Sequence, residues 1–164
     1  MNNFKNYKHL IFSNELTPQT VEEFLSKFNN EKYYLYFESK GGENASCEYL
    51  TNFLNFNKDN VILYTGNFIF SNGFQLVYDF KGEKIIGEST IGMIHLSSFE
   101  VEYINLKNKS SYEYVSSKDL LQYNELLIYK YSQFLNKSEL KELKKGNDIY
   151  LSNKKLKEIF GIKY

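Results

Sequence analysis

The chain has 164 residues, the size of one domain with a substantial buried core. Its 20 basic residues balance its 20 acidic ones, and 42% of the chain is hydrophobic, with 15 Tyr and 14 Phe. This balance excludes the general electrostatic attraction that marks proteins bound to nucleic acid or to an anionic membrane. We therefore expect a single packed domain over residues 1–164 with no nucleic-acid partner.

Cys47 is the sole cysteine, so no internal disulfide can form. Secreted domains of this size often rely on several disulfides, and a lone cysteine favours a reducing compartment. The first residues, MNNFKNYKHLIF, lack the apolar core of a signal peptide. No apolar run approaches the ~20 residues that span a bilayer. These features predict a soluble, cytoplasmic protein with no membrane partner.

Strands and helices are expected to alternate along the first part of the chain. Short apolar runs rich in β-forming residues predict five strands, at residues 9–13, 33–37, 61–65, 83–87 and 92–97. Helices are expected from Pro18, which follows a good N-cap in Thr17, and at residues 44–56 and 72–79. This alternation favours βαβ units and a largely parallel sheet covered by helices.

The pattern changes after residue 100. Residues 101–115 are polar with short alternation and predict a hairpin or a loop, whereas residues 116–135 predict a long amphipathic helix. Asn136 to Glu139 resembles a capping box, which indicates a further short helix that ends at Gly146. A strand-like piece and a helix capped at Ser152 complete the chain.

The segment GNFIFSNGF, residues 66–74, places Ser71 after an apolar run and directly before Asn-Gly. Ser, Asn and Gly all favour turns, so a plain turn is one interpretation. The other is a nucleophile at the start of a helix, surrounded by backbone N–H groups. A serine nucleophile also needs a base, a group that orients the base, and donors for the oxyanion.

Candidates for these three roles can be named, each with a structural alternative. Of the two histidines, His95 ends a predicted strand, where a satisfied, partly buried imidazole is the alternative, and His9 has no comparable setting. Asp148 lies in a GND segment, where a solvated turn is the alternative. Gly41 and Gly42 separate a predicted strand from a helix, so their peptide N–H groups either face an anion or belong to a plain tight turn.

The order and spacing of these segments resemble those of the ClpP-like serine peptidases, the proteolytic subunits of ATP-dependent Clp proteases. YLYFESKGGENASCEYLTNFL resembles the family's strand, S-P-G-G turn and helix. VILYTGNFIFSNGFQLVYDFKGEKIIGESTIGMIH resembles its nucleophile segment, helix and histidine strand. NDIYLSNKKLKEIFGI resembles its R-D-x-x-[FLM]-[ST] segment and closing helix. The similarity covers most of the chain.

The resemblance implies one ClpP-like peptidase domain over residues 1–164. Its fold would be α/β, with a crotonase/ClpP-like core of repeated ββα and βαβ units and a C-terminal helical region. The implied function is a serine endopeptidase that hydrolyses peptides or unfolded proteins, with no cofactor and no metal. The implied assembly is a homo-oligomer, in the family a heptameric ring, and the implied partner is a Clp-type ATPase.

The resemblance also assigns the site. It implies a catalytic triad in which Ser71 is the nucleophile, His95 the general base and Asp148 the orienting acid. The oxyanion-hole amides and the substrate contacts would come from the backbones of these residues: Gly42 and Asn72 for the oxyanion, Gly41 and Gly42 for the substrate.

The chain departs from the family pattern around this site. Lys40 stands where the family's turn has Pro, and Asn72 stands where the family has Met after the nucleophile. The Gly- and Gln-containing segment that follows the family's histidine strand, part of the handle between two rings, is not recognisable in residues 97–115. Two alternatives stay open: a non-catalytic ClpP-like subunit of an oligomer, and a crotonase-type acyl-thioester enzyme, whose fold shares the paired-amide oxyanion hole.

Overall fold

The computed structural model describes residues 7–29, 31–97 and 112–162. The chain divides into two compact units, residues 1–94 with 150–164 and residues 95–149. None of the helices in the described ranges is long and apolar enough to cross a membrane.

A six-stranded sheet organises the first unit. Its strands are β1 (Lys8–Ser13), β2 (Tyr33–Ser39), β3 (Val61–Phe70), β4 (Glu83–Ile86), β5 (Ile91–Ile94) and β6 (Ile149–Leu151). The order is β1-β2-β3-β5-β6, and β4 pairs with β3 off this path. The pairs β1–β2, β2–β3, β3–β4 and β3–β5 are all parallel, which confirms the predicted parallel arrangement.

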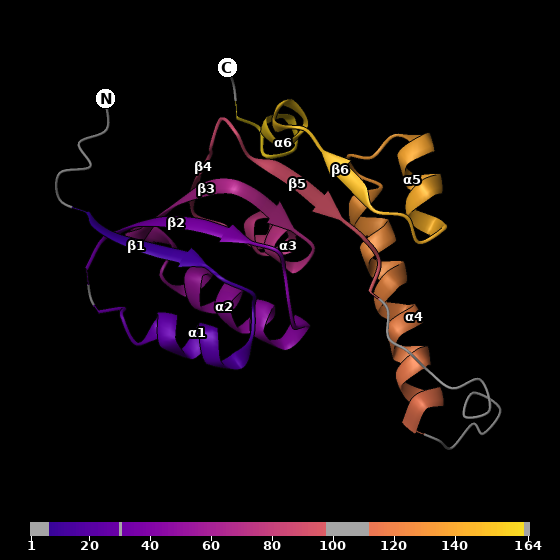
Figure 1. Cartoon of the computed structure of the whole chain (residues 1–164), viewed down its shortest axis with the longest axis horizontal. Coiled ribbons are helices and arrows are strands. Elements are labelled where there is room, and N and C mark those ends of the chain that lie inside the picture. The colour runs from indigo at the N-terminus through magenta and orange to yellow at the C-terminus, as the bar shows by residue number, and fades with distance from the viewer. Residues whose placement is uncertain (1–6, 30, 98–111, 163–164) are drawn as a thin grey trace. The chain divides into compact units, whose positions relative to one another are not determined.

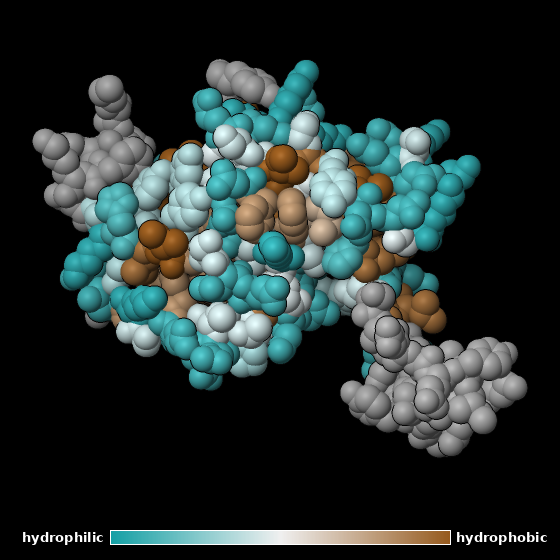
Figure 2. Space-filling model, viewed as in Figure 1, coloured by the Kyte–Doolittle hydropathy of each residue, from teal (hydrophilic) through white to brown (hydrophobic). Residues whose placement is uncertain are grey.

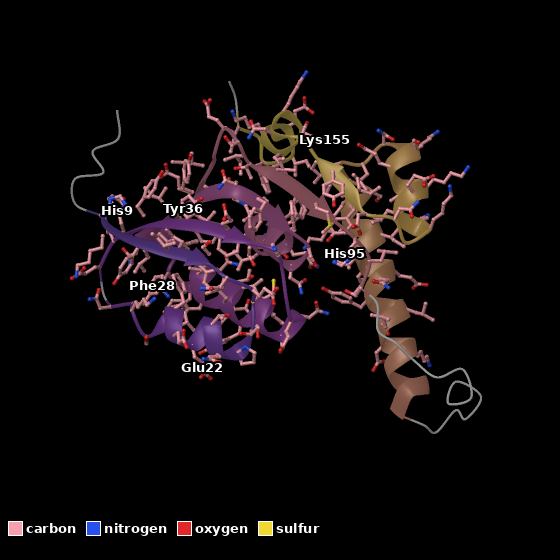
Figure 3. All side chains as sticks on the ribbon, viewed as in Figure 1. His9, Glu22, Phe28, Tyr36, His95 and Lys155 are labelled. Atoms are coloured by element: carbon pink, nitrogen blue, oxygen red, sulfur yellow. The ribbon has the colours of Figure 1, made fainter. Side chains whose placement is uncertain are left out.

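Helices cover one face of this sheet. They are α1 (Pro18–Leu25), α2 (Asn44–Phe56), α3 (Asn72–Asp79) and α6 (Asn153–Ile159), with a 3₁₀ turn, η2 (Lys58–Asn60), after α2. In Figure 1, α1 and α2 lie beneath β1 and β2. Side chains on the helix side, such as Leu35, Phe37 and Leu63, are fully buried. Tyr36 points to the other face and is half-buried, whereas Phe28 lies on the helix side (Figure 3).

The surface carries no single dominant apolar area in the view of Figure 2, where hydrophobic residues lie in separate areas among hydrophilic ones. Scattered exposed apolar side chains of this kind are normal on a folded protein. In the described part of the first unit the most exposed of them are Phe56 on α2, Ile11 on β1 and Tyr150 on β6.

Most helix boundaries agree with those predicted from capping residues and other local features of the sequence. Thr17 caps α1 as expected: its Oγ1 accepts from the N–H of Thr20 at 3.3 Å, and Thr20 Oγ1 accepts from the N–H of Thr17 at 3.1 Å. Helices α2 and α3 have the predicted bounds, and Ser152 caps α6 by accepting from the N–H of Lys155. Capping predicts these boundaries because it acts between residues close in sequence.

Strand β3 is longer than the predicted strand at residues 61–65. It continues to Phe70 because residues 68–70 pair with residues 91–93 of β5. The β2–β3 register shifts between Phe37 and Ser39, where the Glu38 carboxylate accepts from the N–H of Asn67 at 2.6 Å. The carboxylate of Glu38 on β2 therefore takes the place of a backbone acceptor at Asn67, so β3 continues past Gly66 and Asn67. Strand β5, in turn, ends at Ile94, so His95 lies just beyond it rather than within it.

The part of the second unit that the structure describes contains two helices, α4 (Tyr112–Tyr131) and α5 (Lys137–Lys144). The helix predicted at residues 116–135 begins and ends earlier, so residues 112–115 are helical and the hairpin or loop expected there is wrong. The rest of that expected segment, residues 101–111, lies outside the described residues. The capping box at Asn136 is confirmed, because its side chain accepts from the N–H groups of Ser138 and Glu139.

Apolar side chains join α4 to α5, and the buried ones are Leu127, Tyr131, Leu135 and Leu143. Two hydrogen bonds also tie α4 to the segment that follows β5. Asn124 on α4 donates through Nδ2 to the carbonyl of Ser97, and its Oδ1 accepts from the N–H of Ser97, both at 2.9 Å. The segment that follows β5 is thereby fixed to α4.

The side chain of Lys84 on β4 caps the C-terminal end of α3. Its ammonium donates to the carbonyl oxygens of Val77 (2.8 Å) and Phe80 (2.7 Å) and lies 5.1 Å from the ring centre of Phe160. Burial, helped by the nearby charge of Lys81, lowers the pKa of Lys84 from 10.5 to about 8.

This depressed pKa makes stability depend on pH. Below pH 8 the lysine is charged in both states, so the cost of burying its charge is fully present. As the pH rises from about 8 to 10.5, only the unfolded chain keeps the proton, so the free energy of unfolding increases. We predict that Lys84→Met removes this gain, measured by urea denaturation at pH 7, 8, 9 and 10. Lys154→Met, at an exposed lysine of α6, should keep the wild-type profile; parallel profiles for Lys84→Met and wild type would contradict the prediction.

Candidate functional site

Ser71 joins β3 to α3 in a strained conformation. Its backbone has φ 52° and ψ −124°, and among the described residues it is the one non-glycine residue with a positive φ. These angles match the first central position of a type II′ turn, which glycine favours. A serine held there costs about 1–3 kcal/mol, and such strain persists only where the surroundings enforce it. Part of that enforcement is the N–H of Ser71, which donates to the carbonyl of Met93 at 2.8 Å.

The Gly41-Gly42 loop follows β2 and is held by the backbone of Leu16. The N–H of Leu16 donates to the carbonyl of Gly41 at 2.7 Å, and the carbonyl of Leu16 accepts from the N–H of Glu43 at 2.8 Å. Gly42 has φ 141°, and a Cβ there would lie 2.4 Å from the Leu16 carbonyl oxygen. The loop therefore requires glycine at position 42.

The glycine loop and the Ser71 turn lie against each other. Gly41 has φ 104°, and a Cβ on it would meet the Cβ of Ser71 at 2.7 Å and the nitrogen of Asn72 at 3.1 Å. The two segments, which are 30 residues apart in sequence at Gly42 and Asn72, are further joined by a hydrogen bond from Asn72 Nδ2 to the Gly42 carbonyl. The structure therefore brings together four of the predicted site residues: Gly41, Gly42, Ser71 and Asn72.

Two backbone N–H groups are left over in this contact. Those of Gly41 and Glu43 donate to Ser39 Oγ and to the Leu16 carbonyl, whereas those of Gly42 and Asn72 find no acceptor among the described residues. Asn72 is the first residue of α3, where a helix leaves its N–H groups unpaired. In a trans peptide the N–H points opposite to the carbonyl, so the bond from Leu16 to Gly41 also fixes the direction of the Gly42 N–H.

This arrangement has the donors that an oxyanion needs. Two unpaired amides lie next to a half-buried serine, and one of them belongs to the positive end of a helix dipole. Fixed amides of this kind stabilise the negative charge that develops on a carbonyl oxygen under attack.

His95 and Asp148 belong to the second unit. His95, labelled in Figure 3, directly follows β5 and is half-buried. Asp148 directly precedes β6 and is exposed, and its carboxylate makes no hydrogen bond among the described residues of the second unit. Strands β5 and β6 are neighbours in the sheet. The pairing of Ser71 with His95, and of His95 with Asp148, stays a prediction from sequence.

A cavity of about 260 Å³ lies at the carboxyl ends of β1 and β2, beside the glycine loop. Its lining comprises Ser13, Asn14, Glu15, Glu38, Ser39, Lys40 and Phe68. Lys40, in place of the family's Pro, therefore adds a positive charge to a cavity that also holds two carboxylates. Within the described ranges, no three His, Cys, Asp or Glu side chains are grouped so as to hold a metal ion.

Sequence reasoning missed two contributors to the site. Leu16 acts through its backbone, for which no sequence signal exists. The side chain of Asn72 departs from the family's Met, and its capacity to form hydrogen bonds is the signal in the sequence for its role.

The sheet, its parallel order and the helices define a mixed α/β fold of the ClpP type, as predicted. Among solved structures, a ClpP1 variant from Listeria monocytogenes matches with a TM-score of 0.66. The match covers 92% of this chain and 86% of that chain at 16% sequence identity. No family model matches the sequence. No curated protein matches it either. The likeness at this identity shows the fold alone.

The close approach of Gly41 to Ser71 gives a stability prediction. Gly41→Ala should lower the free energy of unfolding by about 3 kcal/mol or more, because a strained φ adds to an overpacked contact with Ser71 Cβ. Gly161→Ala is the matched control: Gly161 also has a positive φ, 67°, but no atom within 4 Å of an added Cβ. It should cost only about 1–2 kcal/mol. Chemical denaturation measures both, and equal losses would show that the contact between the two segments is not tight.

Proposed function

We propose that this chain is a serine-type endopeptidase resembling the proteolytic subunit of Clp protease. The strained backbone of Ser71 beside two unpaired amides is the observation that carries the proposal, because local strain of this kind is concentrated at functional sites. The ClpP-like fold and the family order of Ser71, His95 and Asp148 along the chain support it.

The proposed reaction has two halves. Ser71 Oγ attacks the carbonyl carbon of a peptide bond, its proton passes to His95, and the carbonyl oxygen becomes an oxyanion held by the N–H groups of Gly42 and Asn72. The C–N bond then breaks as His95 returns the proton to the leaving amine. Water hydrolyses the acyl-enzyme by the same steps, and Asp148 keeps the imidazole in the tautomer that accepts the Ser71 proton.

The proposal extends to substrates and assembly. Peptides or unfolded proteins are the substrates, since an extended chain can present its carbonyl to the two amides. A homo-oligomer, with a heptameric ring as its form, a Clp-type ATPase partner and a cytoplasmic location follow from the family that the sequence resembles.

A second candidate is a non-catalytic ClpP-like subunit that supports an active relative within an oligomer. The exposure of Asp148 and the lack of a hydrogen bond to its carboxylate in the second unit favour this candidate. The two candidates differ in one measurable property, the reactivity of Ser71.

We predict that a fluorophosphonate probe adds once to the wild-type protein, at Ser71, as read by intact mass. Ser71→Ala should give no adduct and His95→Ala almost none, because the hydroxyl loses its base. Asp148→Asn should label about 10⁴-fold more slowly, since the imidazole then takes the wrong tautomer.

The control is Ser89→Ala, at an exposed serine of the first unit, which should label like wild type. An adduct that survives in Ser71→Ala would place the nucleophile elsewhere. A wild-type protein that stays unlabelled, under conditions where a known serine peptidase reacts and the chain is assembled, would favour the non-catalytic subunit.

A further inference from the structure

We propose that the side chain of Asn72 is a positioning residue that aligns the two oxyanion amides with each other. This inference rests on the proposed function and adds a role for a side chain whose backbone N–H is itself one of the two donors. The role is to fix the other donor, the N–H of Gly42, relative to it.

The Asn72 side chain is fully engaged. It is 4% exposed, and its Nδ2 donates both to the carbonyl of Gly42 and to Asn44 Oδ1, each at 2.7 Å. Its Oδ1 accepts from Gln75 Nε2 at 3.0 Å. The amide group is therefore held in one rotamer by partners on α2 and α3, with one hydrogen aimed at the glycine loop.

Gly42 needs two anchors because it has no side chain to restrict it. The peptide before it is fixed by the bond from the Leu16 N–H to the Gly41 carbonyl. The peptide after it is held at both of its polar groups, by the bond from the Glu43 N–H to the Leu16 carbonyl and by the bond from Asn72 Nδ2 to the Gly42 carbonyl. With both peptides held, the φ and ψ angles of Gly42 are set, and so is the direction of its N–H.

The second anchor also sets a distance. Because the same residue holds Gly42 by its side chain and offers its own N–H to the oxyanion, the two donors move together. Without the side-chain bond, both peptides around Gly42 would be tied only to Leu16, and the hydrogen bond that joins Gly42 to the Ser71 turn would be lost. An oxyanion hole whose donors are fixed in advance stabilises the transition state without reorganisation.

The test replaces the amide by an apolar group of the same shape, in Asn72→Leu. Asn55→Leu is the matched control: Asn55 on α2 also donates to a carbonyl, that of Asp79, and accepts from the N–H of Lys81, but it lies outside the glycine loop and the Ser71 turn. The readouts are the rate of fluorophosphonate labelling of Ser71, and kcat and KM for hydrolysis of p-nitrophenyl acetate.

We expect Asn72→Leu to lower the labelling rate and kcat by about 10-fold or more, given that a whole oxyanion donor is typically worth ~10²–10³ in rate. KM should stay close to the wild-type value, because the donors act on the transition state rather than on the bound ester. Asn55→Leu should lower stability while its labelling rate stays within about twofold of wild type.

If Asn72→Leu does not fold, Asn44→Ala decides instead. Asn44 is exposed at the start of α2, and its loss removes one of the three hydrogen-bond partners that hold the Asn72 amide while the amide itself stays in place. We expect its labelling rate and kcat to fall about threefold or more. Wild-type rates in a folded Asn72 or Asn44 variant would overturn this inference alone. A wild-type protein that does not label would overturn the proposed function, and this inference with it.

Discussion

The backbone of Gly41 packs against the Cβ of Ser71 with no room for a side chain, and the geometry of the candidate site depends on that contact. It lies where β2 and β3 both end, beside the start of α3 and the loop that leads into α2. It also helps to enforce the positive φ of Ser71. The strain in the serine and the close approach of the glycine are two parts of one packing constraint.

Much of the fold could be predicted from sequence because its signals are local. Thr17, Asn136 and Ser152 cap helices through neighbours within a few residues, and the parallel sheet follows from alternating apolar runs and helices. The extension of β3 to Phe70 could not be predicted, because it depends on pairing with β5 and on the distant carboxylate of Glu38. The early start of α4 could not be predicted, because residues 112–115 continue the short alternation of the polar segment before them.

The residues of the candidate site also divide into those that sequence could predict and those that it could not. Ser71, Gly41, Gly42 and Asn72 could be nominated from residue types and from the resemblance, and the structure brings them together in the first unit. The backbone of Leu16 could not be nominated, because hydrogen bonds by main-chain groups leave no mark on residue identity. The roles of His95 and Asp148, which belong to the second unit, stay predictions from sequence that labelling can test. The ClpP-like fold is compatible with both an active and an inactive subunit.

The two anchors of Gly42 have a mechanical consequence. Leu16, between β1 and α1, holds the peptides on both sides of Gly42, and Asn72, the first residue of α3, holds the Gly42 carbonyl, so the loop is tied to two elements that are far apart in sequence. A displacement of either element would weaken its own hydrogen bonds to the loop, because hydrogen bonds weaken steeply with distance and angle. The direction of the Gly42 N–H therefore depends on the placement of α1, whose cap directly follows Leu16, as well as on that of α3.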